Sequence, residues 1–224
     1  MNDGHLVIGY HGCDVTTRDA LVSGRTQPRG SKNRYDWLGP GFYMFEGDHD
    51  RAMSFAQRAY DEPDKLFTAV HIATPAVVGC VFCVQHCLDM TTRKARTEFM
   101  ASYEFLLASG RELPANSPPS EEDPDGIRRP LDRAVISMVH EAREIGSLPP
   151  YQAVRGAFRQ GPELVPASGF HRDSHVQIAL RDFSCVLGWF VPPGANLLTA
   201  EEYRRAEATL TDFKAAHPKK RVRS

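Results

Sequence analysis

Two spacings of hydrophobic residues occur along this chain, and each predicts one kind of secondary structure. Short apolar or alternating runs are typical of strands, whereas apolar residues three or four positions apart are typical of helices. The first kind predicts strands at 6–10, 41–45, 67–72, 77–84, 176–180 and 185–191. The second kind predicts helices at 16–22, 51–60, 91–109, 131–145 and 200–216. Strands near both ends of the chain with helices between them indicate an α+β fold.

Capping residues and breaks in periodicity set the ends of these elements. Thr199 is the expected N-cap of the final helix, because its hydroxyl can accept a hydrogen bond from the first turn. A threonine at 16 or 17 is expected to cap the first helix, and Gly24 to stop it. Residues 112–130 are rich in proline and acids and predict a mobile surface loop. We therefore expect a single domain over residues 1–216, followed by a short basic tail at 217–224.

Composition and charge exclude several classes of protein. The chain has 224 residues, 42% of them hydrophobic and 25% charged, which is ordinary for a globular protein. The formal net charge of −1 gives no global attraction to nucleic acid or anionic lipid. No apolar run has the length of a membrane helix, and residues 1–20 lack the apolar core of a signal peptide. These features predict a cytoplasmic protein without a membrane partner.

The five cysteines do not predict a disulfide framework, because their number is odd and no secretion signal precedes them. Cys80, Cys83, His86 and Cys87 lie close enough in sequence to suggest a zinc site. No second ligand pair follows at the spacing of a zinc ribbon or finger, and Cys80 lies within an apolar run. We therefore interpret these cysteines as small hydrophobic residues of a strand and expect no metal.

The candidate chemistry lies at the ends of the first two predicted strands. His11 and Gly12 follow the first apolar run, and Gly41 precedes Tyr43 in the second. Gly41 lacks a Cβ, so the backbone there can approach a flat ligand. Tyr43 supplies an aromatic face for such a ligand, and His11 supplies a polar side chain beside the bare backbone of Gly12. This set of groups suits the binding of a nicotinamide ring.

These motifs resemble the ADP-ribosyltransferases of the diphtheria-toxin and poly(ADP-ribose) polymerase type. His11 resembles the histidine of the family's first motif strand, and Tyr43 resembles the tyrosine of its Gly-x-Gly-aromatic-Tyr strand. Gln177, in His-Val-Gln-Ile-Ala-Leu, stands where the family has a glutamate on the third strand. Bacterial toxin-like members of the DUF3990 type also carry a glutamine there, and residues 33–56 resemble them. The resemblance implies a split β-sheet core with flanking helices.

The resemblance also implies NAD as the substrate and assigns roles to individual residues. His11, Tyr43 and Gln177 would be the catalytic set. Further NAD-binding positions would be Tyr10, Gly12, Arg25, Gly41, Phe42 and Phe55. Tyr43 and Phe55 would enclose the nicotinamide ring, and His11 would hydrogen-bond a ribose hydroxyl. A glutamine carries no negative charge, so Gln177 favours transfer of single ADP-ribose units over chain elongation.

The sequence leaves the final activity open between three alternatives. The first is a mono-ADP-ribosyltransferase, a bacterial toxin, phage-defence or effector enzyme, that modifies a protein or a nucleic acid. The others are an NAD hydrolase, in which water replaces the acceptor, and a non-catalytic module that binds NAD or ADP-ribose. A toxin of this kind would have an antitoxin or chaperone protein as a further partner. Loop arginines such as Arg25, Arg29 and Arg34, with the basic tail, could form a local groove for nucleic acid.

Overall fold

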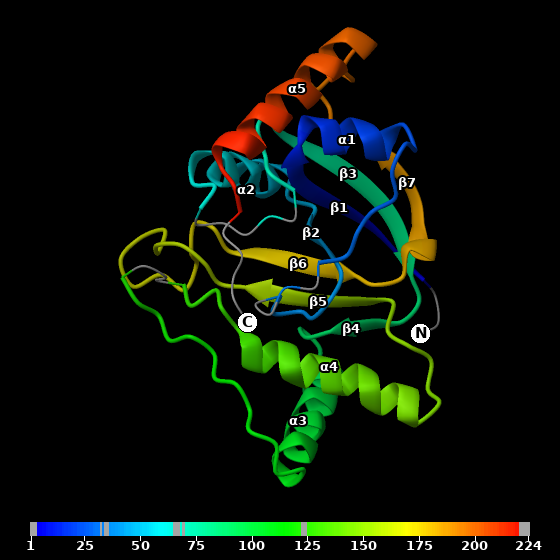
Figure 1. Ribbon diagram of the computed structural model, residues 1–224. Coiled ribbons are helices and arrows are strands. Elements are labelled where there is room, and N and C mark those ends of the chain that lie inside the picture. The colour runs from blue at the N-terminus through cyan, green and yellow to red at the C-terminus, as the bar shows by residue number, and fades with distance from the viewer. Residues whose placement is uncertain are drawn as a thin grey trace. The chain divides into compact units, whose positions relative to one another are not determined.

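The computed structural model describes residues 4–31, 33, 36–64, 68, 70–121 and 125–219. Within these residues the chain forms five α-helices and a mixed open sheet of seven strands, in the order β4-β5-β6-β2-β1-β3-β7 (Figure 1). β4 and β5 are parallel, whereas the β5–β6, β2–β6 and β3–β7 pairs are antiparallel. The predicted α+β class is therefore confirmed. The chain divides into two compact units, Met1–Val7 with Arg29–Glu46 and Cys83–Cys185, and Ile8–Pro28 with Gly47–Phe82 and Val186–Ser224.

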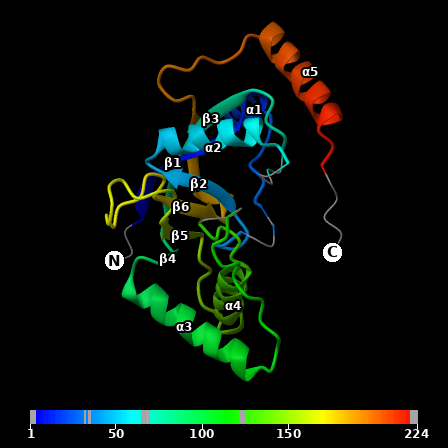
Figure 2. The same cartoon turned by 90° about the vertical axis from the view of Figure 1, so that its left-hand side faces the viewer.

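The first unit is built around α4. Its elements are β2 (Phe42–Glu46), β4 (Cys87–Asp89), α3 (Arg93–Ala108), α4 (Pro130–Ile145), β5 (Ala153–Phe158) and β6 (His175–Leu180). Ile136 and Val139 of α4 form a buried cluster with Val154 of β5. Val135 of α4 forms a second cluster with Leu106 of α3, and Figure 2 shows these two helices beside each other. Different faces of α4 therefore bury it against the sheet and against α3.

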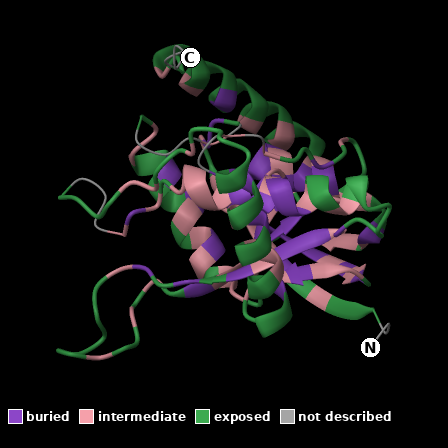
Figure 3. Ribbon diagram, turned by 90° about the horizontal axis from the view of Figure 1, so that it is seen from below, coloured by how far each residue is buried: buried purple, intermediate pink, exposed green. Residues whose placement is uncertain are grey.

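The second unit is held together by two buried aspartates. It contains most of β1 (His5–Asp14) and β3 (Pro75–Val84), with α1 (Val15–Val22), α2 (His49–Asp61), β7 (Val186–Phe190) and α5 (Ala200–Ala216). Asp14 caps α1 by accepting the backbone N–H of Thr16, and it also accepts the N–H of Ala73 and Thr74, each at 2.8 Å. Asp19 accepts the N–H of Leu198 at 2.7 Å and so ties the segment before α5 to α1. Figure 3 shows that most of the surface of α5 is exposed.

All five predicted helices are present close to their predicted bounds. Thr199 caps α5 in a complete capping box with Glu202, as expected. The prediction that a threonine caps α1 is wrong, because the carboxylate of Asp14 takes that position. An aspartate at the end of a strand competes with a following threonine for the same backbone donors, and here the aspartate forms the bond.

Five of the six predicted strands are present. The prediction of a strand at 67–72 is wrong in those of its residues that the structure describes. β1 extends past His11 to Asp14, so His11 lies inside a strand. Thr68 and residues 70–72 form no strand. His71 and Ile72 are nevertheless buried although they pair with no strand. Ile72 packs against Ala56 and Ala59 of α2. The sequence reading also missed β4, which has three residues, and β5, in which alanine and glycine dilute the strand pattern.

The predicted loop at 112–130 has no helix or strand in its described residues before Pro130, where α4 begins. Asn116 fixes this loop to α4. Its side-chain oxygen accepts the backbone N–H of Leu131 at 2.9 Å, and its amide nitrogen donates to Asp132 at 3.0 Å. Since Arg129, the residue before α4, makes no capping bond with its own side chain, Asn116 supplies the cap from the loop.

Candidate functional site

Strands β2 and β6 place Tyr43 and Gln177 on one face of the sheet. Tyr43 lies opposite Ala179 and Phe45 lies opposite Gln177 in this antiparallel pair. Residues directly opposite each other share a face, and so do residues two apart on one strand. Tyr43 and Gln177 are therefore diagonal neighbours on the same face of the first unit, as the predicted site requires of this pair.

The hydroxyl of Tyr43 makes two hydrogen bonds to the turn before β2. It accepts the backbone N–H of Leu38 at 3.0 Å and donates to the carbonyl oxygen of Gly39 at 2.9 Å. The ring is half-buried against the core cluster that contains Leu38. Burial, and to a lesser degree the nearby Asp36 carboxylate, raises the pKa of Tyr43 above its usual range. Tyr43 thus stays neutral and cannot serve as a base near neutral pH.

Gln177 is bound by a residue that sequence reasoning missed. The indole N–H of Trp37 donates to Oε1 of Gln177 at 2.8 Å. Gly156 lies opposite Gln177 on β5, and a Cβ at this glycine would come within 2.7 Å of the indole of Trp37. The missing side chain of Gly156 therefore makes room for Trp37 over the sheet. No local pattern signals this contact, since 140 residues separate Trp37 from Gln177.

Aromatic and basic side chains surround this pair in the first unit. The rings of Trp37 and Phe158 lie 5.1 Å apart, and the guanidinium of Arg129 lies 4.4 Å from the ring of Phe158. His175 lies 5.5 Å from Phe158, and its Nδ1 is 2.6 Å from the carbonyl oxygen of Asp173. An acceptor at Nδ1 places a proton on that nitrogen. The result is a largely buried aromatic cluster beside Gln177.

Packing within the sheet explains why a glycine stands at position 41 and why the side chain of Phe42 is buried. A Cβ at Gly41 would lie 3.0 Å from the backbone of Ala179. Phe42 is 6% exposed and, by strand alternation, faces the side opposite Tyr43. Both positions therefore have a structural explanation, and their contact with NAD stays a prediction.

In the second unit, β1 presents His11 and Gly12 to opposite sides. A Cβ at Gly12 would come within 2.2 Å of the backbone oxygen of Ala52, so α2 fills the space beside this glycine. Because neighbouring strand residues alternate, the half-buried side chain of His11 points away from the face that meets α2. Phe55 lies on α2, half-buried next to the small residue Ala52 one turn earlier.

Tyr10 and Arg25 are engaged with aromatic side chains of the second unit. The ring of Tyr10 meets His49 and Phe190 edge-on, at 5.7 and 6.0 Å. The guanidinium of Arg25 lies 3.9 Å above the ring of Tyr203 on α5, an arrangement typical of a cation–π contact. Arg25 thus has a structural partner in addition to its predicted role in NAD binding.

The cysteines show the character expected of strand residues. Cys80 is fully buried in β3, and burial raises the pKa of its thiol to about 12. Among the residues that the structure describes, no three His, Cys, Asp or Glu side chains are grouped so that they could hold a metal ion.

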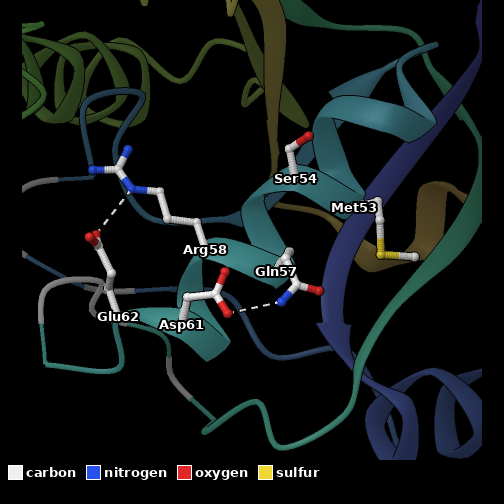
Figure 4. Close-up of a pocket in the computed structure, with 6 residues that line it drawn as sticks. All are labelled: Met53, Ser54, Gln57, Arg58, Asp61 and Glu62. Atoms are coloured by element: carbon white, nitrogen blue, oxygen red, sulfur yellow. Dashed lines mark hydrogen bonds and ion pairs between the residues drawn. The ribbon is translucent and has the colours of Figure 1, made fainter.

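A shallow depression of about 630 Å³ lies on the outward side of α2 (Figure 4). Its lining residues come from this helix and the residue after it: Met53, Ser54, Gln57, Arg58, Asp61 and Glu62. Gln57 donates to Asp61 at 3.0 Å, and Arg58 pairs with Glu62 at 3.5 Å. These side chains satisfy one another along an exposed helix, and none of the predicted site residues lies here.

The structure thus brings Tyr43 and Gln177 onto one face in the first unit, with Gly41 and the oppositely directed Phe42 on the same strand region. It places Tyr10, His11, Gly12, Arg25 and Phe55 in the second unit. Comparison with protein-family models, with curated proteins and with solved structures found no match. No helix in the described ranges has the length and apolar character needed to cross a membrane.

Proposed function

We propose that this protein is an NAD-dependent mono-ADP-ribosyltransferase with an ADP-ribosyltransferase-like split-sheet core. The observation that carries the proposal is the pairing of β2 with β6, which makes Tyr43 and Gln177 diagonal neighbours on one face. The resemblance requires this arrangement of its second and third motif strands. The presence of His11 on a strand and of Phe55 on the helix after β2 agrees with the same motif order.

The proposed reaction breaks the bond between nicotinamide and the ribose C1′ of NAD. Nicotinamide leaves with the bonding electrons, the acceptor donates an electron pair to C1′, and the acceptor's proton passes to solvent. The transition state resembles an oxocarbenium ion, so catalysis depends mainly on positioning and on stabilisation of charge. The ring of Tyr43 would hold the nicotinamide plane, and Gln177 would hydrogen-bond the ribose without adding charge.

A neutral residue at the third position favours transfer of one ADP-ribose unit. The acceptor would be a macromolecule, either a protein or a nucleic acid, in keeping with a bacterial toxin or defence effector and an antitoxin partner. Arg25 is partly committed to Tyr203. Arg34 and the tail from 220 onward lie outside the described residues.

One observation favours a second candidate, a non-catalytic module that binds NAD or ADP-ribose. The side-chain oxygen of Gln177 already accepts a hydrogen bond from Trp37. The residue at the family's acidic position is therefore both uncharged and partly occupied, which suits binding better than chemistry.

Incubation with NAD labelled in the adenylate part, with and without cell extract, tests the proposal. We expect label in macromolecules, lost after protease or nuclease treatment according to the acceptor, together with release of nicotinamide. Tyr43→Ala, checked for folding by circular dichroism, should abolish both signals, while Gln57→Ala on the exposed side of α2 should keep them. Nicotinamide release at the same rate without any acceptor would indicate an NAD hydrolase. Binding of NAD by calorimetry without turnover would indicate the non-catalytic module, and neither binding nor turnover would refute all three.

A further inference from the structure

We propose that Trp37 is a positioning residue that determines which end of the Gln177 amide faces the ligand. This inference rests on the proposed function, because it concerns the residue at the family's acidic position. Trp37 lies in the turn before β2, and the resemblance assigns it no role. Its indole N–H is 2.8 Å from Oε1 of Gln177.

The chemistry of the two groups fixes the orientation of the amide. An indole nitrogen can only donate, whereas an amide has one oxygen that accepts and one nitrogen that donates. The oxygen of Gln177 must therefore face Trp37, and its NH₂ group must point elsewhere. A flipped amide would oppose two donors and lose the bond. This pair is thus free of the usual ambiguity between oxygen and nitrogen in an amide.

The position of the indole is itself well determined. Gly156 leaves the space that the ring occupies, since a Cβ there would lie 2.7 Å from the indole. The ring of Phe158 lies 5.1 Å away, and the guanidinium of Arg129 lies 5.5 Å from the indole centre. Glycine below, an aromatic ring at one side and a cation above restrict the indole to one placement.

In this orientation Gln177 presents different hydrogen-bonding groups from those of the glutamate that the family has at this position. A glutamate offers only acceptors, and so binds a hydroxyl through the hydroxyl's proton. Gln177 held by Trp37 has one lone pair of its oxygen occupied and turns its N–H donors away from the indole. A group bound by these donors presents an oxygen lone pair, such as the oxygen of a ribose hydroxyl or a carbonyl oxygen of the acceptor. Trp37 would contribute to binding only through Gln177.

The hydrogen bond can be tested by NMR on the unliganded protein. The chain has two tryptophans, so Trp37→Phe and Trp189→Phe assign the two indole N–H signals. Gln177→Ala should shift the Trp37 signal upfield and leave the Trp189 signal in place. Gln177→Glu keeps an acceptor and should retain the downfield position. An unmoved Trp37 signal in Gln177→Ala would overturn the proposed contact, whatever the protein's activity.

The positioning role is tested by a double-mutant cycle on NAD affinity and on kcat/KM for nicotinamide release. Trp37→Phe keeps an aromatic ring but removes the donor, and we expect about a tenfold loss, typical of one buried hydrogen bond. Gln177→Ala should lose at least as much, and the double variant should lose no more than Gln177→Ala alone. Trp189→Phe is the matched control and should leave both quantities unchanged.

The possible failures are distinguishable. Losses that multiply in the double variant would show that Trp37 acts independently of Gln177, and would overturn the inference. Full activity in Trp37→Phe would do the same while leaving the proposed function intact. A wild-type protein that neither binds nor cleaves NAD would overturn the proposed function, and the positioning role with it.

Discussion

Replacement of Tyr43 by phenylalanine separates its structural role from its proposed role in binding. The change removes only the hydroxyl, which joins the N–H of Leu38 at 3.0 Å and the carbonyl of Gly39 at 2.9 Å. Leu38 is fully buried, so water cannot replace the lost partner of its N–H. An unsatisfied buried backbone group costs about 1–3 kcal/mol, and we expect a loss of about 2 kcal/mol in the free energy of unfolding. In a chain of this length that corresponds to a fall of about 4–8 °C in Tm.

The expected effect on ligand binding is much smaller. Phenylalanine keeps the ring that would stack on nicotinamide, so the affinity for NAD should change by less than about threefold. Urea unfolding followed by circular dichroism measures the first quantity, and calorimetric titration with NAD measures the second. Tyr60→Phe is a suitable control, because Tyr60 is 41% exposed on α2 and exposed substitutions usually change stability by less than about 0.5 kcal/mol.

Two results would refute this reasoning. If Tyr43→Phe unfolds at the same urea concentration as the wild type, the hydroxyl does not support the turn as described. If Tyr43→Phe retains its stability but loses NAD binding, the hydroxyl contacts the ligand, and its bonds to Leu38 and Gly39 cannot persist in the complex.

Three further predictions concern the fold. Gly12→Ala should destabilise the protein by about 1–3 kcal/mol, because its Cβ would meet the backbone of α2, whereas Gly188→Ala, which has open space, should be neutral in the same urea assay. Burial, reinforced by Arg181 and Arg143, lowers the pKa of His140 to about 3, so between about pH 3 and 6.5 the unfolded state binds a proton that the folded state does not. The free energy of unfolding should therefore fall by about 2 kcal/mol from pH 7 to pH 5, and by less in His140→Phe. An equal fall in both proteins would contradict the assignment to His140. Thr199→Ala removes a complete capping box and should cost about 1 kcal/mol, seen as faster hydrogen exchange at the start of α5; unchanged exchange there would argue against the cap.

The sequence predicts an element well where the residues that determine it are close together in the chain. α5 could be predicted in full, because Thr199 and the residues of its first turn are adjacent in sequence. β5 could not, because alanine and glycine dilute its strand pattern and the Trp37 ring that occupies the space over Gly156 comes from a distant segment. The segment at 67–72 has the composition of a strand, yet its described residues form no strand, and Ile72 buries its side chain against α2. Local pattern cannot distinguish burial by packing from burial by pairing.

The candidate site also depends partly on local sequence patterns and partly on contacts between distant segments. An aromatic residue after a glycine predicts Tyr43 as a site residue, and the motif order predicts Gln177, but neither pattern reveals which protein groups these side chains bind. The sequence predicts that the backbone of Gly12 is open to a ligand. In the structure, the missing side chain of Gly12 also leaves room for the backbone of Ala52. The contact of Trp37 with Gln177 is determined by sheet register and by a glycine on a third strand, so no short sequence window contains it.

Residues 37–39 connect the two predicted site residues of the first unit. Trp37 binds the amide of Gln177, while the backbone of Leu38 and Gly39 binds the hydroxyl of Tyr43. A shift of this turn would therefore move the aromatic face and the amide together. Because a ring and an amide must keep a fixed separation to hold one ligand, a common support maintains their geometry better than two independent ones. Substitutions of Trp37 or Leu38 should consequently affect ligand binding, although the resemblance assigns neither residue a role.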